Sequence, residues 1–184
     1  MKITELTPQA QQRAHENFPI DYDWWDYTYD YIVEQAALLG ITISTKPIRL
    51  ISGKTQEELA IYFSGFWSQG DGSCFDGNYR YAKGAPKAVT AELVQVAKDL
   101  QAIQKKNFYK LTATIQAKDN YISVQPFKDD DYTDCDELED ALKDFNAWIY
   151  KSLEAEYEYQ SSFEQFLEDC EANDYDFDES GKLV

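Results

Sequence analysis

Histidine and cysteine are the scarcest chemically reactive residues in this sequence of 184 amino acids. There is one histidine, His15, and the three cysteines, Cys74, Cys135 and Cys170, lie far apart without a Cys-x-x-Cys pair. An odd number of scattered cysteines does not predict a disulfide scaffold, and a zinc site needs clustered cysteine and histidine ligands. His15 falls in the last turn of an expected helix, where it would complement the helix dipole. We therefore expect no catalytic histidine, no metal site and no cofactor.

Long apolar runs and nucleotide-binding motifs are also missing. No stretch approaches the roughly 18 apolar residues that a membrane span requires, and residues 1–5 lack the apolar core of a signal peptide. Gly70-Asp-Gly72 is not a phosphate loop, because no Gly-Lys-Ser/Thr follows it. No metalloprotease or nucleophile-elbow motif is present. We expect a soluble protein of a reducing cytoplasm, without a membrane partner and without enzymatic activity; an enzyme of unrecognised type stays an open alternative.

Basic residues are few and unevenly distributed. The chain has 17 Lys and Arg residues against 34 Asp and Glu residues, which gives a net charge of −17. Residues 111–184 carry 5 basic and 21 acidic side chains, whereas residues 51–110 carry 8 basic and 6 acidic ones. The net field repels phosphate, so we expect no direct binding of nucleic acid. The polarised distribution instead predicts an acidic binding face.

Apolar residues are sufficient for a folded core, at 43% of the chain, with 15% aromatic residues. Helical spacing of apolar positions predicts three main helices, at residues 22–39, 86–105 and 136–159. Alternating patterns predict strands between them, at residues 41–45, 59–64, 108–116 and 121–126. We predict a single α+β domain over residues 1–184, with an antiparallel sheet of three to five strands packed against these helices. Its C-terminal helical part, residues 128–184, is acidic.

Several shorter features are marked by single residues. Thr7 before Pro8 predicts the start of a short helix that runs to about Glu16, and Gly40 predicts the C-terminal cap of the helix before it. A further short helix is predicted at 163–171. The tail beyond it either docks through Tyr175 and Phe177 or stays loose.

The most unusual stretch is residues 63–77, where four glycines alternate with four aromatic residues. Asp71-Gly72 predicts a tight turn, where glycine would allow positive φ or a close approach of the backbone. One interpretation is a structural hairpin whose rings fill the core below the turn. The other is a recognition loop, and the side chains that it would present are Phe66, Trp67, Gln69 and Asp71.

Acidic side chains on the 136–159 helix and the connector before it form the second candidate site. They are Asp129, Asp130, Asp131, Asp136, Glu137, Asp140, Asp144, Glu154 and Glu158. Carboxylates in a row resemble a line of backbone phosphates, and a protein that grips nucleic acid through Lys and Arg would meet them with the same groups. The alternative is a solvated helix face. The connector could also gather a hard cation, but it lacks the EF-hand spacing, and a solvated acidic turn is the preferred interpretation.

Five segments carry a family resemblance that covers most of the chain. They are residues 2–7, 61–77, 79–84, 108–114 and 148–159. In these segments the chain resembles small acidic proteins of bacteriophages and prophages that are often labelled antitoxins of a toxin–antitoxin stability system. The resemblance implies a protein in the host cytoplasm, and it carries over no catalytic or ligand-binding residue.

Charge and resemblance together favour a partner that is a basic, nucleic-acid-handling host protein or nucleoprotein complex. Neutralising a toxin or a defence complex, including anti-CRISPR or antirestriction action by DNA mimicry, is the function that we expect. The alternative is a regulatory or structural protein-binding module that acts through the loop at residues 63–77, with the acidic helix only aiding solubility.

Overall fold

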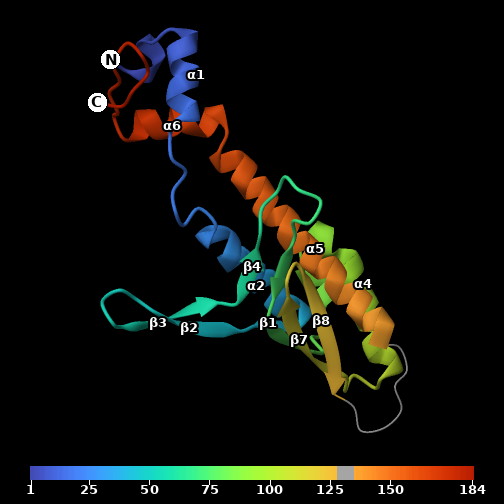
Figure 1. Cartoon of the computed structure of the whole chain (residues 1–184). Helices are drawn as coiled ribbons and strands as arrows, with labels where there is room; N and C mark the ends of the chain where they lie inside the picture. Colours follow the sequence, from blue (N-terminus) through green and yellow to red (C-terminus); the bar gives the residue numbers. More distant parts are fainter. Residues whose placement is uncertain (128–134) are drawn as a thin grey trace. The chain divides into compact units, whose positions relative to one another are not determined.

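The computed structural model describes residues 1–127 and 135–184 and groups the chain into two units. Unit 1 combines residues 1–26 with residues 153–184, and unit 2 comprises residues 27–152. Helices and antiparallel strands are both present, so the predicted α+β class is confirmed (Figure 1). The single domain over residues 1–184 stays a prediction.

Unit 2 is built on a four-stranded sheet in the order β1-β6-β7-β8, with every neighbouring pair antiparallel. The strands are β1 (Ile41–Ile43), β6 (Gly77–Arg80), β7 (Thr112–Lys118) and β8 (Tyr121–Phe127). Side chains alternate between the two faces, so Ile41, Tyr79 and Ile115 are buried while Thr42 and Asn78 are exposed. One face of the sheet therefore forms the core. The predicted strand count is confirmed, and the strands predicted at residues 108–116 and 121–126 pair with each other as a hairpin.

Two small hairpins leave the sheet at a junction of three strand pairs. They are β2 (Thr45–Arg49) with β3 (Thr55–Leu59), and β4 (Ile61–Phe63) with β5 (Ser73–Phe75). At the junction, Ser44 N–H donates to the Asp76 carbonyl at 2.8 Å, Asp76 N–H to Ala60 at 3.0 Å, and Ala60 N–H to Ser44 at 2.8 Å. This closed ring of hydrogen bonds satisfies backbone groups where three ladders end.

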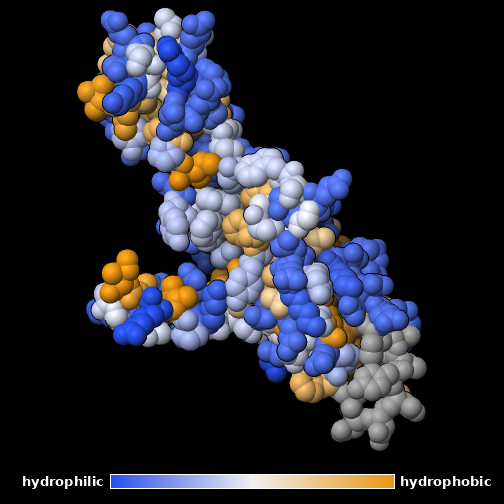
Figure 2. All heavy atoms as spheres, viewed as in Figure 1, coloured by the Kyte–Doolittle hydropathy of each residue, from blue (hydrophilic) through white to orange (hydrophobic). Residues whose placement is uncertain are grey.

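The β2–β3 hairpin extends from the junction as a thin ribbon (Figure 1). All of its residues are exposed or half-buried, and its tip carries Leu50 and Ile51, of which Ile51 is fully exposed. Figure 2 shows these apolar side chains as a patch at the end of the ribbon. Arg49 and Lys54 lie beside them in the sequence, so the tip is both apolar and basic.

The helices of unit 2 pack together over the buried face of the sheet. They are α2 (Asp26–Leu39), α3 (Ala85–Ala88), η2 (Ala91–Leu93), α4 (Val94–Lys106) and the part of α5 (Cys135–Gln160) up to residue 152. The ring of Trp148 on α5 lies 5.8 Å from that of Tyr31 on α2, and its Nε1 donates to Glu92 at 3.0 Å. Phe75 and Phe145 meet edge to face at 5.7 Å, and both are completely buried. The three predicted helices thus supply the predicted core.

Two element boundaries differ from the sequence prediction for local reasons. The helix predicted at residues 86–105 is divided, because Val89 and Thr90 are extended and the Thr90 N–H donates to the Gln35 side chain at 2.8 Å. The strand predicted from Phe108 begins at Thr112, because Phe108 and Tyr109 both have positive φ. Tyr109 N–H instead donates to the Gln104 carbonyl at 2.8 Å, which closes the end of α4.

Helix α2 begins at Asp26 instead of near residue 22, and it ends as predicted. Gly40 follows Leu39 with φ of 88°, and its N–H donates to the Ala37 carbonyl at 3.1 Å. A Cβ at this position would lie against the Arg80 carbonyl oxygen, so only glycine fits here. Ile32, Ala36 and Leu39 are buried and form the side of α2 that faces the core.

Unit 1 is helical and contains both ends of the chain. It includes η1 (Ile3–Glu5), α1 (Pro8–Glu16), the end of α5 and α6 (Phe163–Ala172). Thr7 Oγ1 accepts the Ala10 N–H at 3.3 Å, which confirms Thr7 as the cap of α1. The core is small, and its buried members are Ile3, Leu6, Ala10, Ala14, Phe166, Cys170 and Phe177.

The two ends of the chain are tied together within unit 1. The Met1 amino group donates to the Phe177 carbonyl at 3.0 Å, and the Phe177 N–H donates back to Met1 at 2.8 Å. Lys2 forms ion pairs with Asp174 at 2.8 Å and Asp176 at 3.2 Å. Because Phe177 is buried, the tail docks, which decides between the two alternatives that the sequence left open.

Candidate functional site

The acidic face of α5 in unit 2 consists of Asp136, Glu137, Asp140 and Asp144, and all four are exposed. Leu138, on the opposite side of the helix, is completely buried, as are the next two apolar positions of that stripe, Leu142 and Phe145. The predicted separation of an acidic side from a core side is therefore present in the structure. Substitutions on the acidic face leave the core stripe untouched.

Lysines partly neutralise this face. Lys106 on α4 pairs with Glu137 at 3.3 Å, and Lys143 pairs with Glu139 one turn away at 2.9 Å. The hydrogen bond to Glu139 and the nearby carboxylates, which include Asp140 and Asp136, raise the pKa of Lys143. Within the described part of the chain, Asp136, Asp140 and Asp144 form no ion pair. These three carboxylates are the most available to a cationic partner.

The other predicted acidic residues do not belong to this face. Glu154 and Glu158 lie on the part of α5 that belongs to unit 1, where Glu154 is half-buried and Glu158 is exposed. Asp129, Asp130 and Asp131, with the suggested cation connector, fall outside the described residues. The structure therefore brings together four of the nine predicted carboxylates.

The glycine-aromatic loop, residues 64–72, joins β4 to β5 and is shaped by Asp71. Its carboxylate accepts the Ser68 N–H at 2.9 Å, the Trp67 N–H at 3.0 Å and the Ser64 hydroxyl at 3.1 Å. The backbone hydrogen bond from Ser68, followed by that from Trp67, lowers the pKa of Asp71. The Asp71 carboxylate is therefore oriented toward groups of its own loop.

Gly72 allows a close approach of the backbone and does not adopt positive φ. A Cβ there would lie 3.0 Å from the Asn120 carbonyl oxygen in the β7–β8 turn. The Asn120 side chain also donates to the Gly70 carbonyl. Of the two uses of glycine that the sequence offered, the close approach is therefore the one present, and the predicted tight turn does not form at Asp71-Gly72.

The loop is fixed to α5 and presents one large aromatic residue. Phe66 stacks on Phe63 at 5.7 Å and lies 5.5 Å from Tyr150, whose hydroxyl donates to the Gly65 carbonyl at 2.9 Å. Trp67 is 76% exposed and Gln69 is exposed as well. Of the four predicted loop residues, Trp67 and Gln69 are thus the ones that reach solvent.

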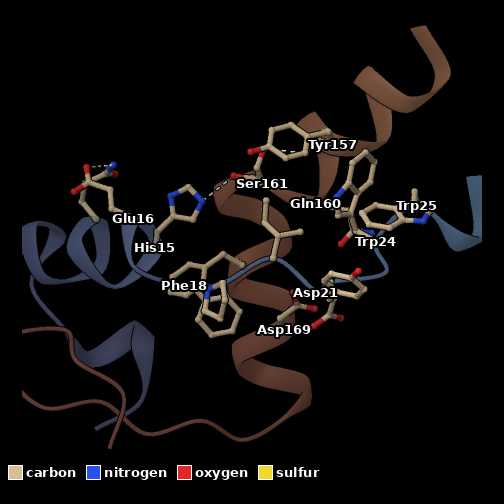
Figure 3. A pocket seen from close by; sticks show the side chains of 15 residues that line it. His15, Glu16, Phe18, Asp21, Trp24, Trp25, Tyr157, Gln160, Ser161 and Asp169 are labelled. Carbon is tan, nitrogen blue, oxygen red and sulfur yellow. Dashed lines mark hydrogen bonds between the residues drawn. The ribbon is translucent and has the colours of Figure 1, made fainter. Parts of the chain in front are cut away.

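A cavity of about 690 Å³ in unit 1 was not predicted from the sequence. It is bounded by α1, the connector after it, the end of α5 and α6, and Figure 3 shows its lining side chains. Aromatic residues supply much of the wall: Phe18, Tyr22, Trp24, Trp25, Tyr157 and Phe166. Three carboxylates also line it, those of Glu16, Asp21 and Asp169. The lining comes from residues 12–25 and 157–169, and no local motif links two segments so far apart.

His15 helps to hold the cavity wall together. Its Nε2 lies 2.9 Å from the Ser161 carbonyl oxygen, and a carbonyl only accepts, so Nε2 carries the proton. The imidazole ring is 5.3 Å from both Phe163 and Phe166 on α6. His15 therefore connects α1 to the end of α5 and to α6, which is a positioning role.

The described residues were compared with two kinds of feature, membrane-spanning helices and groups of metal ligands. Within residues 1–127 and 135–184, no helix is both long and apolar enough to cross a membrane. The same residues contain no group of three His, Cys, Asp or Glu side chains that could hold a metal ion. Cys74 and Cys170 are buried free thiols, and burial raises the pKa of Cys170 to about 11.

A family model for a domain of unknown function, DUF8835, matches residues 24–162 of this chain. That range covers most of the sequence, so the chain belongs to this family. Searches of curated proteins and of solved structures gave no match.

Proposed function

We propose that this member of the DUF8835 family is an acidic protein of a phage or mobile element that binds and neutralises a basic, nucleic-acid-handling host protein. The supporting observation is the row of Asp136, Asp140 and Asp144 on the exposed side of α5, backed by a fully buried stripe. Because the core is on the other side, the protein can present these carboxylates without strain.

The spacing of these carboxylates supports mimicry of a nucleic-acid backbone. An α-helix rises about 1.5 Å per residue, so side chains four residues apart recur at about 6 Å. One strand of DNA carries a phosphate about every 3.4 Å along the helix axis. The row therefore has roughly the spacing of every second phosphate, and a Lys or Arg groove could accept it.

The test is displacement of proteins from DNA-cellulose. Proteins of a bacterial lysate are bound to the resin at 0.1 M salt and eluted with the purified protein. We expect the wild type to release a discrete basic protein, and the triple variant Asp136→Lys, Asp140→Lys, Asp144→Lys to release at least tenfold less. In a direct binding assay with the released protein, raising the salt should weaken the complex steeply, because the screening length falls from about 10 Å at 0.1 M to about 3 Å at 1 M.

A matched control separates position from total charge. Asp30 on α2 and Glu57 and Glu58 on β3 are exposed acids of unit 2 outside the acidic face of α5, so reversing them to Lys changes the net charge equally. This control variant should release the partner like the wild type. Equal loss of release in both triple variants would show that only net charge matters, and no release by the wild type would reject the proposed neutralisation.

A second candidate function, a protein-binding module that acts through the loop, is favoured by the exposure of Trp67 on a loop fixed by Asp71. Rigid exposed tryptophans are common centres of protein interfaces. The double variant Trp67→Ala, Gln69→Ala keeps the acidic face of α5. If this variant loses the partner while the triple Lys variant retains it, the loop carries the function.

A further inference from the structure

We propose that the cavity of unit 1 binds the cationic end of an arginine or lysine side chain that the basic partner presents. The inference rests on the proposed function, because it takes the partner to be a basic protein. It names a second contact, which is short-ranged and specific, in addition to the acidic face of α5.

The first support is the arrangement of the aromatic rings. Trp24 and Trp25 lie 5.5 Å apart at 82°, Tyr22 and Trp25 5.8 Å apart at 60°, and Trp24 and Tyr157 5.4 Å apart at 67°. Rings at such steep angles form several walls instead of one flat stack (Figure 3). A cation within about 6 Å of an aromatic ring is attracted by the electrons of its face, and tryptophan is the strongest partner.

The second support is the charge of the lining. Glu16, Asp21 and Asp169 come from three different segments, α1, the connector and α6. Among the described residues that line the cavity there is no lysine or arginine. Three carboxylates without a basic side chain make the lining negatively charged, which favours a cationic ligand and disfavours an anionic one.

Neighbouring side chains orient two of these carboxylates. Gln12 Nε2 donates to Glu16 Oε1 at 3.0 Å, and Gln165 Nε2 donates to Asp169 Oδ1 at 2.9 Å. In each case one carboxylate oxygen is held by an amide, which leaves the other oxygen able to accept from a ligand. A guanidinium or ammonium group supplies several such donors, whereas an apolar ligand would desolvate the carboxylates without replacing their hydrogen bonds.

The volume is large enough for one residue of a peptide chain. About 690 Å³ is in the middle of the range for small-ligand sites, which accommodates a long side chain with its flanking backbone. Binding of one such residue is weak, with a dissociation constant on the order of 1 mM. The contact becomes effective in the complex because the partner is already bound to the acidic face of α5, which raises the local concentration of its arginine or lysine side chain.

The experiment is a titration of the full chain with short synthetic peptides, followed by the indole N–H signals of the tryptophans in NMR spectra. The probes are acetyl-Gly-Arg-Gly-amide, its lysine equivalent and its citrulline equivalent, which keeps the shape of arginine without the charge. We expect saturable shifts of the Trp24 and Trp25 signals with the two cationic peptides, and at least tenfold weaker binding of citrulline.

The variant Glu16→Gln, Asp21→Asn removes two charges at exposed positions and keeps the shape of both side chains. We expect it to weaken binding of the arginine peptide about three- to tenfold. The matched control is Glu164→Gln, Glu168→Gln, which removes two exposed charges of α6 that do not line the cavity. The control should bind like the wild type.

Three results would overturn the inference: equal binding of citrulline, equal weakening in both variants, or binding of free spermidine with no binding of the peptides. The last result would mark a site for small free cations. Because the peptide titration does not involve the acidic face of α5, it can succeed while release from DNA-cellulose fails, or the reverse, so the two proposals fail separately.

Discussion

The two units of the chain hold their cores by different means. Unit 2 joins three strand pairs through the ring of hydrogen bonds at Ser44, Ala60 and Asp76, and it buries large residues such as Phe75 and Phe145. Unit 1 takes 26 residues from the beginning of the chain and 32 from its end, and two of its seven core residues are alanines. The smaller unit also contains the large cavity. Small units bury a smaller share of their surface, so unit 1 should be the less stable of the two.

The largest effect is expected from Phe166→Ala in unit 1. Removing a buried phenylalanine costs about 3–5 kcal/mol. At roughly 0.05–0.15 kcal/mol per residue, unit 1 has only about 3–9 kcal/mol of stability to lose. Native-state hydrogen exchange should show that α1 and α6 lose protection while β6 and β7 keep theirs.

Phe145→Ala, at a completely buried position of unit 2, is the matched control. It should lower the protection of β6 and β7 without unfolding them. If Phe166→Ala removed protection from both units at once, the chain would unfold as one domain, in agreement with the sequence prediction.

A smaller effect is expected from Gly181→Ala, which tests how the tail docks on α1. Gly181 has φ of 88°, and a Cβ there would meet the Ala10 carbonyl oxygen far inside contact distance. Backbone strain and overpacking together should cost about 2–4 kcal/mol in thermal unfolding. The control is Gly53→Ala, which has nearly the same φ of 82° but no atom within 4 Å of the added Cβ, and it should cost about 1 kcal/mol. Equal losses of stability in the two variants would show that the close contact with α1 does not restrict the residue at position 181.

Features set by neighbouring residues were predictable from the sequence. The cap of α1 at Thr7, the end of α2 at Gly40 and the turn between β7 and β8 each depend on local backbone chemistry. The separation of acidic and buried sides on α5 follows from the helical period alone.

Features that depend on tertiary contacts were not predictable. Position 72 accommodates glycine best because the Asn120 carbonyl oxygen lies close to it. The division of the helix at Thr90 depends on a hydrogen bond to Gln35, 55 residues away. The cavity needs α1 and α6 to meet, so its carboxylates looked like ordinary solvated acids in the sequence. Trp24 and Trp25 fall inside the helix predicted at residues 22–39, whereas the observed helix begins at Asp26.

The smallest expected effect concerns one carboxylate in each unit that accepts hydrogen bonds from its own loop. The Ser68 and Trp67 N–H groups lower the pKa of Asp71 in unit 2, and the Ser180 hydroxyl, followed by the Lys182 N–H, lowers that of Asp178 in unit 1. A carboxyl whose pKa is lower in the folded state stabilises the fold fully above its unfolded value of 3.8. That contribution is lost as the pH falls below 3.8 and through the folded pKa.

Acid should therefore loosen each loop independently. In an NMR titration from pH 5 to 2, the amide signals of Trp67 and Ser68 should move with a midpoint below 3.8, because both groups donate to Asp71. Asp71→Asn should abolish this movement and leave the titration of the Ser180 and Lys182 amides, which donate to Asp178, unchanged. Asp178→Asn should do the reverse. A midpoint at or above 3.8 for either loop would mean that its carboxylate is not held by these hydrogen bonds, and a shift of both loops by one substitution would show that the two units respond to acid together.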